Sequence, residues 1–400
     1  MDGRNEKLGQ KNNKEDSGNC LYADLDQNRD EALSLARLAA EKPHHLANPG
    51  DIPPYLLEQL KKDGGKSIDE SSRQLRAIID QENASSIVPH LTVQGRGDRE
   101  VYDAKGGFAQ PGNKARFEGE GPSGVADADQ VYEQLGLIRK FYKEEFNRDS
   151  IDGQGMKYVA TVNYGENVQN AFWDNKQMWF GNPGPNSPFK TFVLLDVIGH
   201  EITHGVTDAE THLWQWQQAG ALHEHFSDVF GELIDQYAKN QKAEDADWLH
   251  GAGAFKEGFK GRAVRDMLNP GTAYDDPKLG KDPQRAHMKD IYEGWNDNGG
   301  VHINSGIPNR AFALFAKSLG GYAWKEAGHI WYDARKAAGN NPNFAEFAYQ
   351  TIEQAKLLKR PDLLEKLEKS WEAVGVVPTA AKNSGPTPIQ NPAANLKKAG

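Results

Sequence analysis

Cysteine is almost missing from this sequence. Cys20 is the single cysteine among 400 residues, so no disulfide can form within the chain. This fits a reducing compartment, although a secreted protein stabilised by metal ions would also manage without disulfides. The first twenty residues contain no apolar h-region, so we expect no classical signal peptide. The chain is therefore expected to be cytoplasmic as made, with secretion by a non-classical route as the alternative.

Long apolar runs and long basic runs are missing too. No stretch approaches 18 uninterrupted apolar residues, which argues against a membrane-spanning helix. The formal net charge is -10, and no long Lys/Arg cluster is visible, so nucleic acid is not an expected partner. Apolar residues nevertheless make up 38% of the chain, with 9 Trp, 13 Tyr and 16 Phe. That content predicts a folded protein with a buried core.

The pattern of apolar residues changes along the chain, from strand-type runs to helical periodicity, and predicts an α+β fold. Short β-type runs such as KYVATVNYG and KQMWFGN, separated by Gly, Pro and Asn, predict a strand-rich half with one helix near 127–146. Helical periodicity dominates from Phe192 onward. We divide the chain into a flexible tail at 1–50 with a short helix at 29–42, a helical segment at 51–98, a strand-rich half at 99–205, a helical half at 206–377 and a low-complexity tail at 378–400.

The segment after the first tail carries clear helix signals. Pro53 and Pro54 favour the start of a helix, and Gly64 and Gly65 favour its end. A second helix is expected to follow, up to about residue 81.

The stretch DVIGHEITHGVTD, residues 196–208, contains two histidines four apart. In a helix, His200 and His204 share a face and can offer both imidazoles to one ion. Glu201 lies about 100° round the helix, which suits a position beside an ion-bound water better than direct ligation. Taken alone, the pattern leaves two ordinary helical histidines as an equal alternative.

A catalytic zinc takes three protein ligands and keeps one position open for water. Glu224, separated from His204 by nineteen residues and in a separate helical segment, is the best candidate for the third ligand. Asp228, one turn further on, could accept the free N–H of a zinc-bound histidine. The flanking His223 and His225 point to other sides of that helix, and we expect them to be surface or packing residues.

A third element is WNDNGGVHINSG, residues 295–306. Its double glycine predicts a tight turn that presents His302, with Asp297 near enough to orient the imidazole. Beside a zinc-bound water, such a histidine would stabilise the negative charge that develops on an attacked carbonyl.

Together these residues resemble the thermolysin family of zinc endopeptidases. Further blocks that look like the family are SIDGQGMKYVATVNYG, NAFWDNKQMWFGN and GALHEHFSDVFGELIDQYA, within a match from about residue 101 to 376. The segment IPPYLLEQL resembles the short propeptide of the protealysin-like branch. The resemblance implies a thermolysin-like zincin fold with the active-site cleft between the two halves.

The resemblance also implies a mechanism, with proteins or peptides as substrates. Zinc would lower the pKa of its water and polarise the scissile carbonyl, with Glu201 as general base and His302 as oxyanion stabiliser. Arg265 matches the family arginine that binds a substrate carbonyl; a surface salt bridge is the plainer alternative. The remaining matches are to a backbone-binding edge segment, at Asn170 and Ala171, and to an apolar pocket, at Val197 and Val264. Cleavage before bulky hydrophobic residues is therefore expected.

Several positions depart from the family pattern. Gln215 stands where the family usually has a second oxyanion donor, a tyrosine, and the loss of one such donor costs about 10²- to 10³-fold in rate. His223 stands in place of an asparagine, and His250 in place of an aliphatic pocket residue. Asp196, Asp235 and Asp247 match calcium ligands, but Leu249 and Ala252 replace carboxylates. We therefore expect at most one weak calcium ion.

Three functions stay open at this point. The favoured one is an active zinc endopeptidase, made as a proenzyme whose N-terminal segment is removed near residues 90–100. The second is an inactive zinc-binding interaction protein, because of Gln215. The third, a zinc aminopeptidase, lacks support because no G-x-M-E-N motif is present. The helix with Tyr55 and Leu56 is expected to be an inhibitory propeptide, and a permanent structural cap is its alternative.

Overall fold

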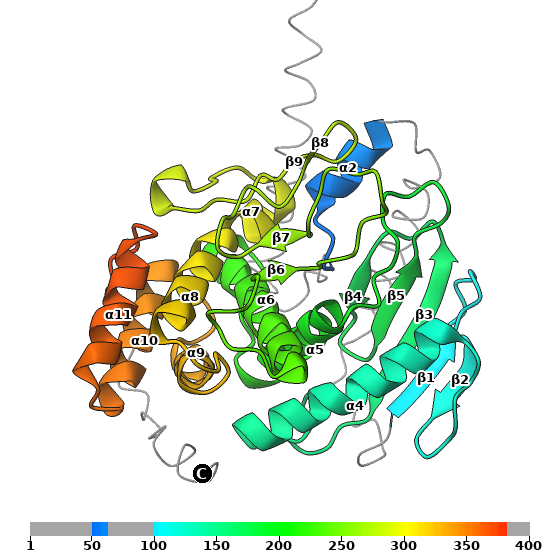
Figure 1. Ribbon diagram of the computed structural model, residues 1–400, viewed down its shortest axis with the longest axis horizontal. Coiled ribbons are helices and arrows are strands. Elements are labelled where there is room, and N and C mark those ends of the chain that lie inside the picture. The colour runs from blue at the N-terminus through cyan, green and yellow to red at the C-terminus, as the bar shows by residue number, and fades with distance from the viewer. Residues whose placement is uncertain (1–49, 63–98, 382–400) are drawn as a thin grey trace, which may run out of the picture.

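The computed structural model describes residues 50–62 and 99–381 (Figure 1). The expected tail at 1–49, the short helix at 29–42, the second helix before residue 81 and residues 382–400 of the C-terminal tail lie outside the described residues. Within them, no helix has the length and apolar character needed to cross a membrane.

The N-terminal half is built on a five-stranded sheet of order β2-β1-β3-β5-β4. Its strands are β1 Arg99–Asp103, β2 Asn113–Phe117, β3 Tyr158–Glu166, β4 Ala171–Trp173 and β5 Met178–Asn182. β1, β3 and β5 run parallel, while β2 and β4 pair antiparallel to their neighbours. β4 is therefore an edge strand, and Figure 1 shows it on the side of the sheet nearest the helical half.

Helix α4, Ala126–Phe146, covers one face of this sheet (Figure 1). It agrees with the helix expected near 127–146. Asp127 and Asp129 lie in the first turn, where negative charge is favoured by the helix dipole. Asn147 ends the helix in the left-handed region, at φ 52°.

The C-terminal half is mainly helical. Its first two helices are α5 Leu195–Glu210 and α6 Gln217–Lys239, which pack against each other. After short strands come five further helices: α7 Asn296–Asn304, α8 Gly306–Leu319, α9 Glu326–Ala337, α10 Phe344–Leu357 and α11 Pro361–Glu372. The short elements are β6 Leu249–His250, β7 Arg265–Asp266, β8 Asp275–Asp276, β9 Gly280–Lys281 and the 3-10 helix η1 Met288–Asp290.

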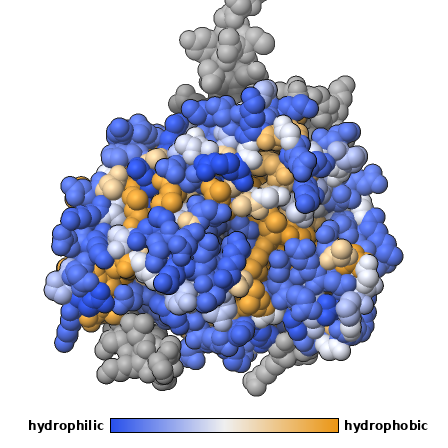
Figure 2. All heavy atoms as spheres, viewed as in Figure 1, coloured by the Kyte–Doolittle hydropathy of each residue, from blue (hydrophilic) through white to orange (hydrophobic). Residues whose placement is uncertain are grey.

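One hydrophobic core runs through both halves and includes Phe141 of α4, Phe230 of α6 and Trp331 of α9. Figure 2 shows a mainly hydrophilic face with a narrow band of apolar side chains near its middle, where the two halves meet. A strand-rich half followed by a helical half confirms the predicted α+β class.

The short helix α2, Pro54–Lys62, begins at one of the two expected prolines. Ile52, Leu56 and Leu60 are buried in the common core, with Tyr55 and Leu57 packed against it. α2 contacts α7, and Gln59 lies beside Gly280 of β9. This N-terminal segment is therefore an integral part of the described structure.

Candidate active site

The two helices that carry the candidate ligands approach each other closely. A Cβ at Gly231 of α6 would lie 2.5 Å from the carbonyl oxygen of Asp196, and one at Gly199 of α5 would lie 2.9 Å from Ile234. Glycine at both positions therefore allows the close contact of α5 and α6. This contact brings Glu224 within reach of the histidines on α5.

His200, His204 and Glu224 converge in the buried interior. The Nε2 atoms of the two histidines are 2.9 Å apart, and Glu224 Oε2 lies 3.4 Å from the first and 3.6 Å from the second. Oε2 is buried and makes no hydrogen bond with the described residues. Two imidazoles and one carboxylate form a known donor set of catalytic zinc sites, and the buried acceptor that they surround fits a cation.

Other side chains orient both imidazoles. Asp228 Oδ1 lies 2.9 Å from His200 Nδ1, which leaves Nε2 to face Glu224. His204 Nδ1 lies 2.7 Å from His223 Nδ1, and His223 Nε2 lies 2.8 Å from Asp208 Oδ1. A ligand whose second nitrogen is bound in this way has a fixed tautomer and ring orientation.

The expectation that His223 is a surface or packing residue is wrong. Its side chain is only 1% exposed and holds the second imidazole of the cluster. Because α5 and α6 are so close, the residue that precedes Glu224 also faces α5. His225 does pack in the interior, with Nδ1 2.7 Å from Asn309 and Nε2 2.8 Å from the indole N–H of Trp331.

Glu201 is fully buried next to these residues. Burial, aided by the negative charges of Asp51 and Glu224, raises its pKa to about 8, against the lowering effect of His200. A carboxyl group tuned in this way titrates near neutral pH, as a general base requires.

His302 lies on α7, directly after the expected turn. Asp297, Asn298, Gly299 and Gly300 all have positive φ, and a Cβ at Gly299 would lie 2.7 Å from Gln217. The turn lets Asp297 reach back to His302, with Oδ1 2.6 Å from Nδ1 and Oδ2 accepting the backbone N–H at 2.8 Å. Burial lowers the pKa of His302, but Glu224 and Asp297 raise it to about 9, so the imidazole can donate at neutral pH.

An extended stretch of the N-terminal segment lies against these residues. His302 Nε2 is 3.1 Å from the carbonyl oxygen of Gly50. The Asp51 N–H donates to the carbonyl of Ala171 at 3.0 Å. The Ile52 N–H donates to Asn170 Oδ1 at 2.8 Å, and Arg265 Nη1 donates to the carbonyl of Asp51 at 2.8 Å. Residues 50–52 are thus bound through their backbone beside the edge strand β4.

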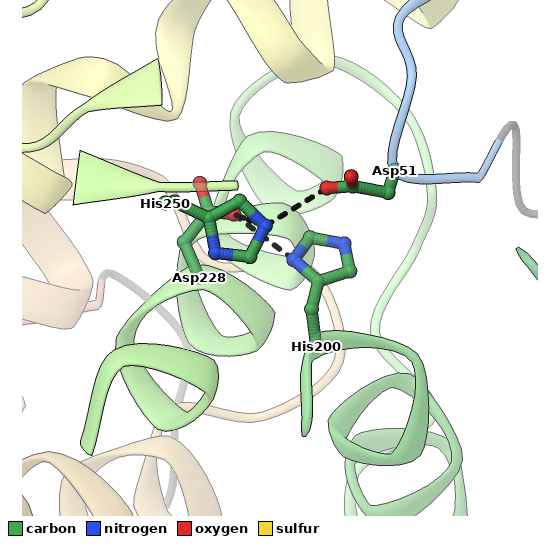
Figure 3. Close-up of side chains that lie close together, drawn as sticks. All are labelled: Asp51, His200, Asp228 and His250. Atoms are coloured by element: carbon green, nitrogen blue, oxygen red, sulfur yellow. Dashed lines mark hydrogen bonds and ion pairs between the residues drawn. The ribbon is translucent and has the colours of Figure 1, made fainter. Parts of the chain in front are cut away.

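The Asp51 side chain is also bound. Its Oδ1 contacts Arg265 Nη2 and lies 2.9 Å from His250 Nε2. Figure 3 shows Asp51 and His250 facing each other, with Asp228 and His200 next to them. Burial alone raises the pKa of Asp51, but Arg265 and His250 lower it well below its usual value. The carboxylate is therefore charged. Arg265 also donates from Nε to Asp228 Oδ1 at 2.9 Å, so it is no surface salt bridge.

The sequence also pointed to two valines of the substrate pocket and to Gln215. Val197 and Val264 are buried, and Val264 lies against Gly251. Gln215 is half-buried just before α6, and its carboxamide oxygen makes no hydrogen bond with the described residues. Its role in oxyanion binding stays a prediction.

The expected calcium ligands do not gather into one metal-binding group among the described residues. Asp196 lies near Glu232 and His250 and accepts the Gly251 N–H at 2.6 Å. Asp235 pairs with Lys239 at 2.5 Å, and Asp247 accepts the Leu249 N–H at 3.2 Å. Burial and the negative charges of Asp196, Asp235 and Asp247 raise the pKa of Glu232 well above its usual value, so these acidic groups lie near one another, and one weak calcium ion stays a prediction.

Comparison with known proteins agrees with this geometry. Residues 61–208 match the family model "Thermolysin metallopeptidase, catalytic domain", and residues 212–376 match "Thermolysin metallopeptidase, alpha-helical domain". The chain is 41% identical over 332 residues to an "Extracellular metalloprotease" of Pectobacterium carotovorum subsp. carotovorum, covering 81% of this chain and 95% of that protein. It is also 41% identical over 341 residues to "Protease PrtS" of Photorhabdus sp. (strain Az29), covering 82% and 92%.

A solved structure is similar over the same range. The precursor of protealysin, a metalloproteinase from Serratia proteamaculans, matches with a TM-score of 0.73 and 42% identity, covering 82% of this chain and 99% of that one. The convergent cluster, the matched family models and these relatives together establish that the chain belongs to the thermolysin family of metalloendopeptidases, with protealysin-like relatives.

Proposed function

We propose that the protein is a zinc endopeptidase in which His200, His204 and Glu224 hold the ion. Bound zinc supplies a Lewis acid that polarises the scissile carbonyl and acidifies the attacking water. The support is the buried cluster itself, in which two oriented imidazoles and a carboxylate without a hydrogen-bond partner face one point.

Glu201 is the proposed general base. It removes a proton from the water while the oxygen attacks the carbonyl carbon, and it delivers that proton to the amine nitrogen when the C–N bond breaks. Its pKa, raised to about 8 by burial first of all, favours a group that can both accept and return a proton near neutral pH.

His302 is the proposed oxyanion stabiliser, with Asp297 as the residue that positions it. Its Nε2 already contacts a peptide carbonyl, that of Gly50, at 3.1 Å. A charged donor at this distance stabilises an oxygen that gains negative charge in the transition state.

The observation that carries the proposal is the peptide backbone bound beside this cluster. Asn170, Ala171 and Arg265 bind the backbone of residues 51 and 52, as the family resemblance implies for a substrate. Main-chain hydrogen bonds at a sheet edge are a general way to bind an extended peptide.

We further propose that residues 50–62 act as an inhibitory propeptide. They lie on the groups proposed to bind substrate, and Ile52, Leu56 and Leu60 anchor them in the core. If this segment were a permanent cap, a substrate would have to reach the metal cluster by another route. The expected cut near residues 90–100 lies between the described ranges. N-terminal sequencing of aged protein should find such a cut, whereas a persistent full-length chain with full activity would contradict the propeptide role.

The central test combines metal content and peptidase activity for the wild type and Glu201→Gln. We expect about one zinc per chain in both proteins and loss of turnover only in the variant. The general-base step contributes about 10²- to 10⁴-fold. If the wild type binds zinc but cleaves no peptide even after removal of its N-terminal segment, the protein is an inactive zinc-binding interaction protein instead.

Substrate preference and destination stay open to test. Cleavage before bulky hydrophobic residues remains the prediction from family resemblance, and the surroundings of Asp51 argue for a different side chain, as developed below. We propose synthesis in the cytoplasm with non-classical export, since one relative is named an extracellular metalloprotease. Fractionation of cells and medium tests this.

A further inference from the structure

The Gly50–Asp51 peptide bond lies where a substrate bond would be attacked. The Gly50 carbonyl faces His302, the proposed oxyanion stabiliser, at 3.1 Å. The Asp51 N–H donates to Ala171, and the Asp51 carbonyl accepts from Arg265. By this register, Asp51 occupies the position of the residue that follows the cleaved bond, and its side chain marks the pocket for that residue.

The walls of this pocket carry hydrogen-bond donors. Arg265 Nη2 and His250 Nε2 both reach Asp51 Oδ1 (Figure 3 shows the His250 side of the pocket). Arg265 is 1% exposed, and the side chains of His250 and Asp51 are completely buried. With residues 50–62 docked, bulk water therefore does not reach these donors, and the Asp51 carboxylate is their acceptor.

Asp228 is the other carboxylate nearby, and both of its oxygens already have hydrogen-bond partners. Its Oδ1 binds His200 Nδ1 and Arg265 Nε at 2.9 Å each, and its Oδ2 accepts from Asn309 Nδ2 at 2.8 Å. Asp228 lies 3.8 Å from His250 Nε2, too far for a good hydrogen bond. An apolar side chain in place of Asp51 would leave the buried His250 donor without its acceptor, and such a loss is costly.

His250 faces carboxylates on both sides. Its Nε2 is 2.9 Å from Asp51, and its Nδ1 is 3.9 Å from Asp196 Oδ2. The family position is aliphatic by resemblance, so His250 changes the character of the pocket.

We infer that this pocket is built for an acidic side chain, so that the enzyme cleaves before aspartate or glutamate. The inference rests on the proposed peptidase function and names its substrate class. The recognition elements are the Arg265 guanidinium and the His250 imidazole, and the Asp51 carboxylate is the ligand that occupies them in the full chain.

A metal ion is the rival occupant, because Asp51, His200, Asp228 and His250 form a compact group of ligand types. The Arg265 guanidinium, however, contacts both carboxylates, at Asp51 Oδ1 and, at 2.7 Å, at Asp228 Oδ1. It therefore already provides the positive charge that a metal would bring. A cation at this point would also be repelled by Arg265.

The first test uses the zinc-loaded, processed enzyme and furylacryloyl dipeptide amides that differ in one residue, Gly-Asp, Gly-Asn and Gly-Leu. We expect kcat/KM to be about 100-fold higher for Gly-Asp than for Gly-Leu, since a site with buried polar groups rejects a side chain that cannot pair with them. His250→Leu should reduce this ratio at least 10-fold. Equal or faster cleavage of Gly-Leu by the wild type overturns the inference and leaves the peptidase function intact.

The second test does not need turnover. It decides whether the pocket prefers a carboxylate even if no peptide is cleaved, an outcome that would count against the proposed function. It uses the full chain with Glu201→Gln, in which self-cleavage is suppressed, and adds Asp51→Glu, Asp51→Asn or Asp51→Leu. Amide hydrogen exchange of residues 50–62 reports how firmly the segment is docked. A carboxylate pocket predicts exchange at least 10-fold faster for Leu than for Asp, with Glu nearest to Asp. Protection that is equal or greater with Leu shows an apolar pocket and overturns the inference.

Discussion

Two buried polar clusters meet at Asp228, and the chain supplies them in different ways. The metal cluster consists of His200 and His204 from one turn of α5 and Glu224 from the next helix. The pocket cluster joins Asp51 of the N-terminal segment to His250 and Arg265, which pair with each other on strands β6 and β7. The spacing of residues in the sequence predicts the metal cluster, whereas the pocket cluster is visible only in the structure.

The clusters also differ in the charge that they lack. In the metal cluster, one nitrogen of each histidine and the Glu224 oxygen, all of which are metal-ligand atoms, face one point, so we propose a cation as the missing partner. In the pocket cluster, a guanidinium and an imidazole face one point, so the missing partner is an anion, which Asp51 provides. Asp228 binds a member of each, His200 and Arg265. A proposed cation site and a neighbouring anion site thus share one buried carboxylate, that of Asp228.

The strongest way to break the metal cluster is Glu224→Gln. The carboxamide removes the negative charge that faces both histidines, so zinc should be lost and peptidase activity should fall to background. Metal analysis of the purified chain and turnover of a furylacryloyl peptide check both points. Glu144→Gln on α4 is a matched control, because Glu144 pairs with Tyr237 outside both clusters. A variant that keeps stoichiometric zinc would contradict the assigned ligand set.

Glu210→Gln removes a largely buried charge that lies outside both clusters. It therefore separates a loss of stability from a change at the metal cluster or the pocket cluster. Glu210 contacts Arg148 and Arg335 and accepts from the Tyr332 hydroxyl at 2.7 Å. Loss of one partner in a buried ion-pair network costs about 3–5 kcal/mol. We therefore expect a clearly lower urea midpoint with unchanged zinc content and unchanged preference between Gly-Asp and Gly-Leu peptides.

The destabilisation by Glu210→Gln should depend on pH. Burial raises the pKa of Glu210, but Arg335 and Arg148 lower it further, so that it ends below its usual 4.5. The wild-type ion pairs thus contribute stability above about pH 4.5, and this contribution is lost as the pH falls through the folded-state pKa. Urea titrations at pH 7 and pH 4 should show a smaller difference at pH 4. A difference that grows toward acid would contradict this role of Glu210.

Asp228→Asn tests the carboxylate that the two clusters share. The carboxamide would bring an N–H donor to Asn309 Nδ2, whose own side chain is held by His225 through Oδ1. We expect zinc affinity to fall about 10- to 100-fold, the usual cost of losing such an outer partner. Competition with a chelator measures it. Asp297→Asn is the control, since it orients His302 rather than a ligand and should leave zinc affinity unchanged.

The sequence predicted the α+β fold and the family because those depend on local periodicity and on spaced blocks of residues. It also pointed to His200, His204 and Glu224, since i, i+4 spacing on a helix places two side chains on one face. Their convergence in the structure agrees with that prediction.

The family resemblance pointed to Arg265 and His250 as substrate-binding and pocket residues, but the sequence did not relate either of them to Asp51. Asp51 and Arg265 are 214 positions apart, and Asp51 and His250 are 199 apart. No local pattern relates such residues. His223 was misjudged for another reason, because its angular position on α6 was considered without the close approach of α5 that Gly231 allows. The one available signal was that His250 and His223 both depart from the family pattern, and each departure forms a new buried contact.

The smallest expected effect is a gain, from Gln215→Tyr. By family resemblance, a tyrosine here donates a second hydrogen bond to the developing oxyanion, and the loss of such a donor costs about 10²- to 10³-fold. Because Gln215 is only half-buried, its surroundings do not fix a tyrosine hydroxyl in place, and we expect only about a tenfold rise in kcat with little change in KM. The effect acts on the attacked carbonyl, so zinc content and the Gly-Asp preference should both stay constant. Gln215→Phe is the matched control, with the ring but no hydroxyl. If phenylalanine raises kcat as much as tyrosine, packing rather than hydrogen bonding explains the gain.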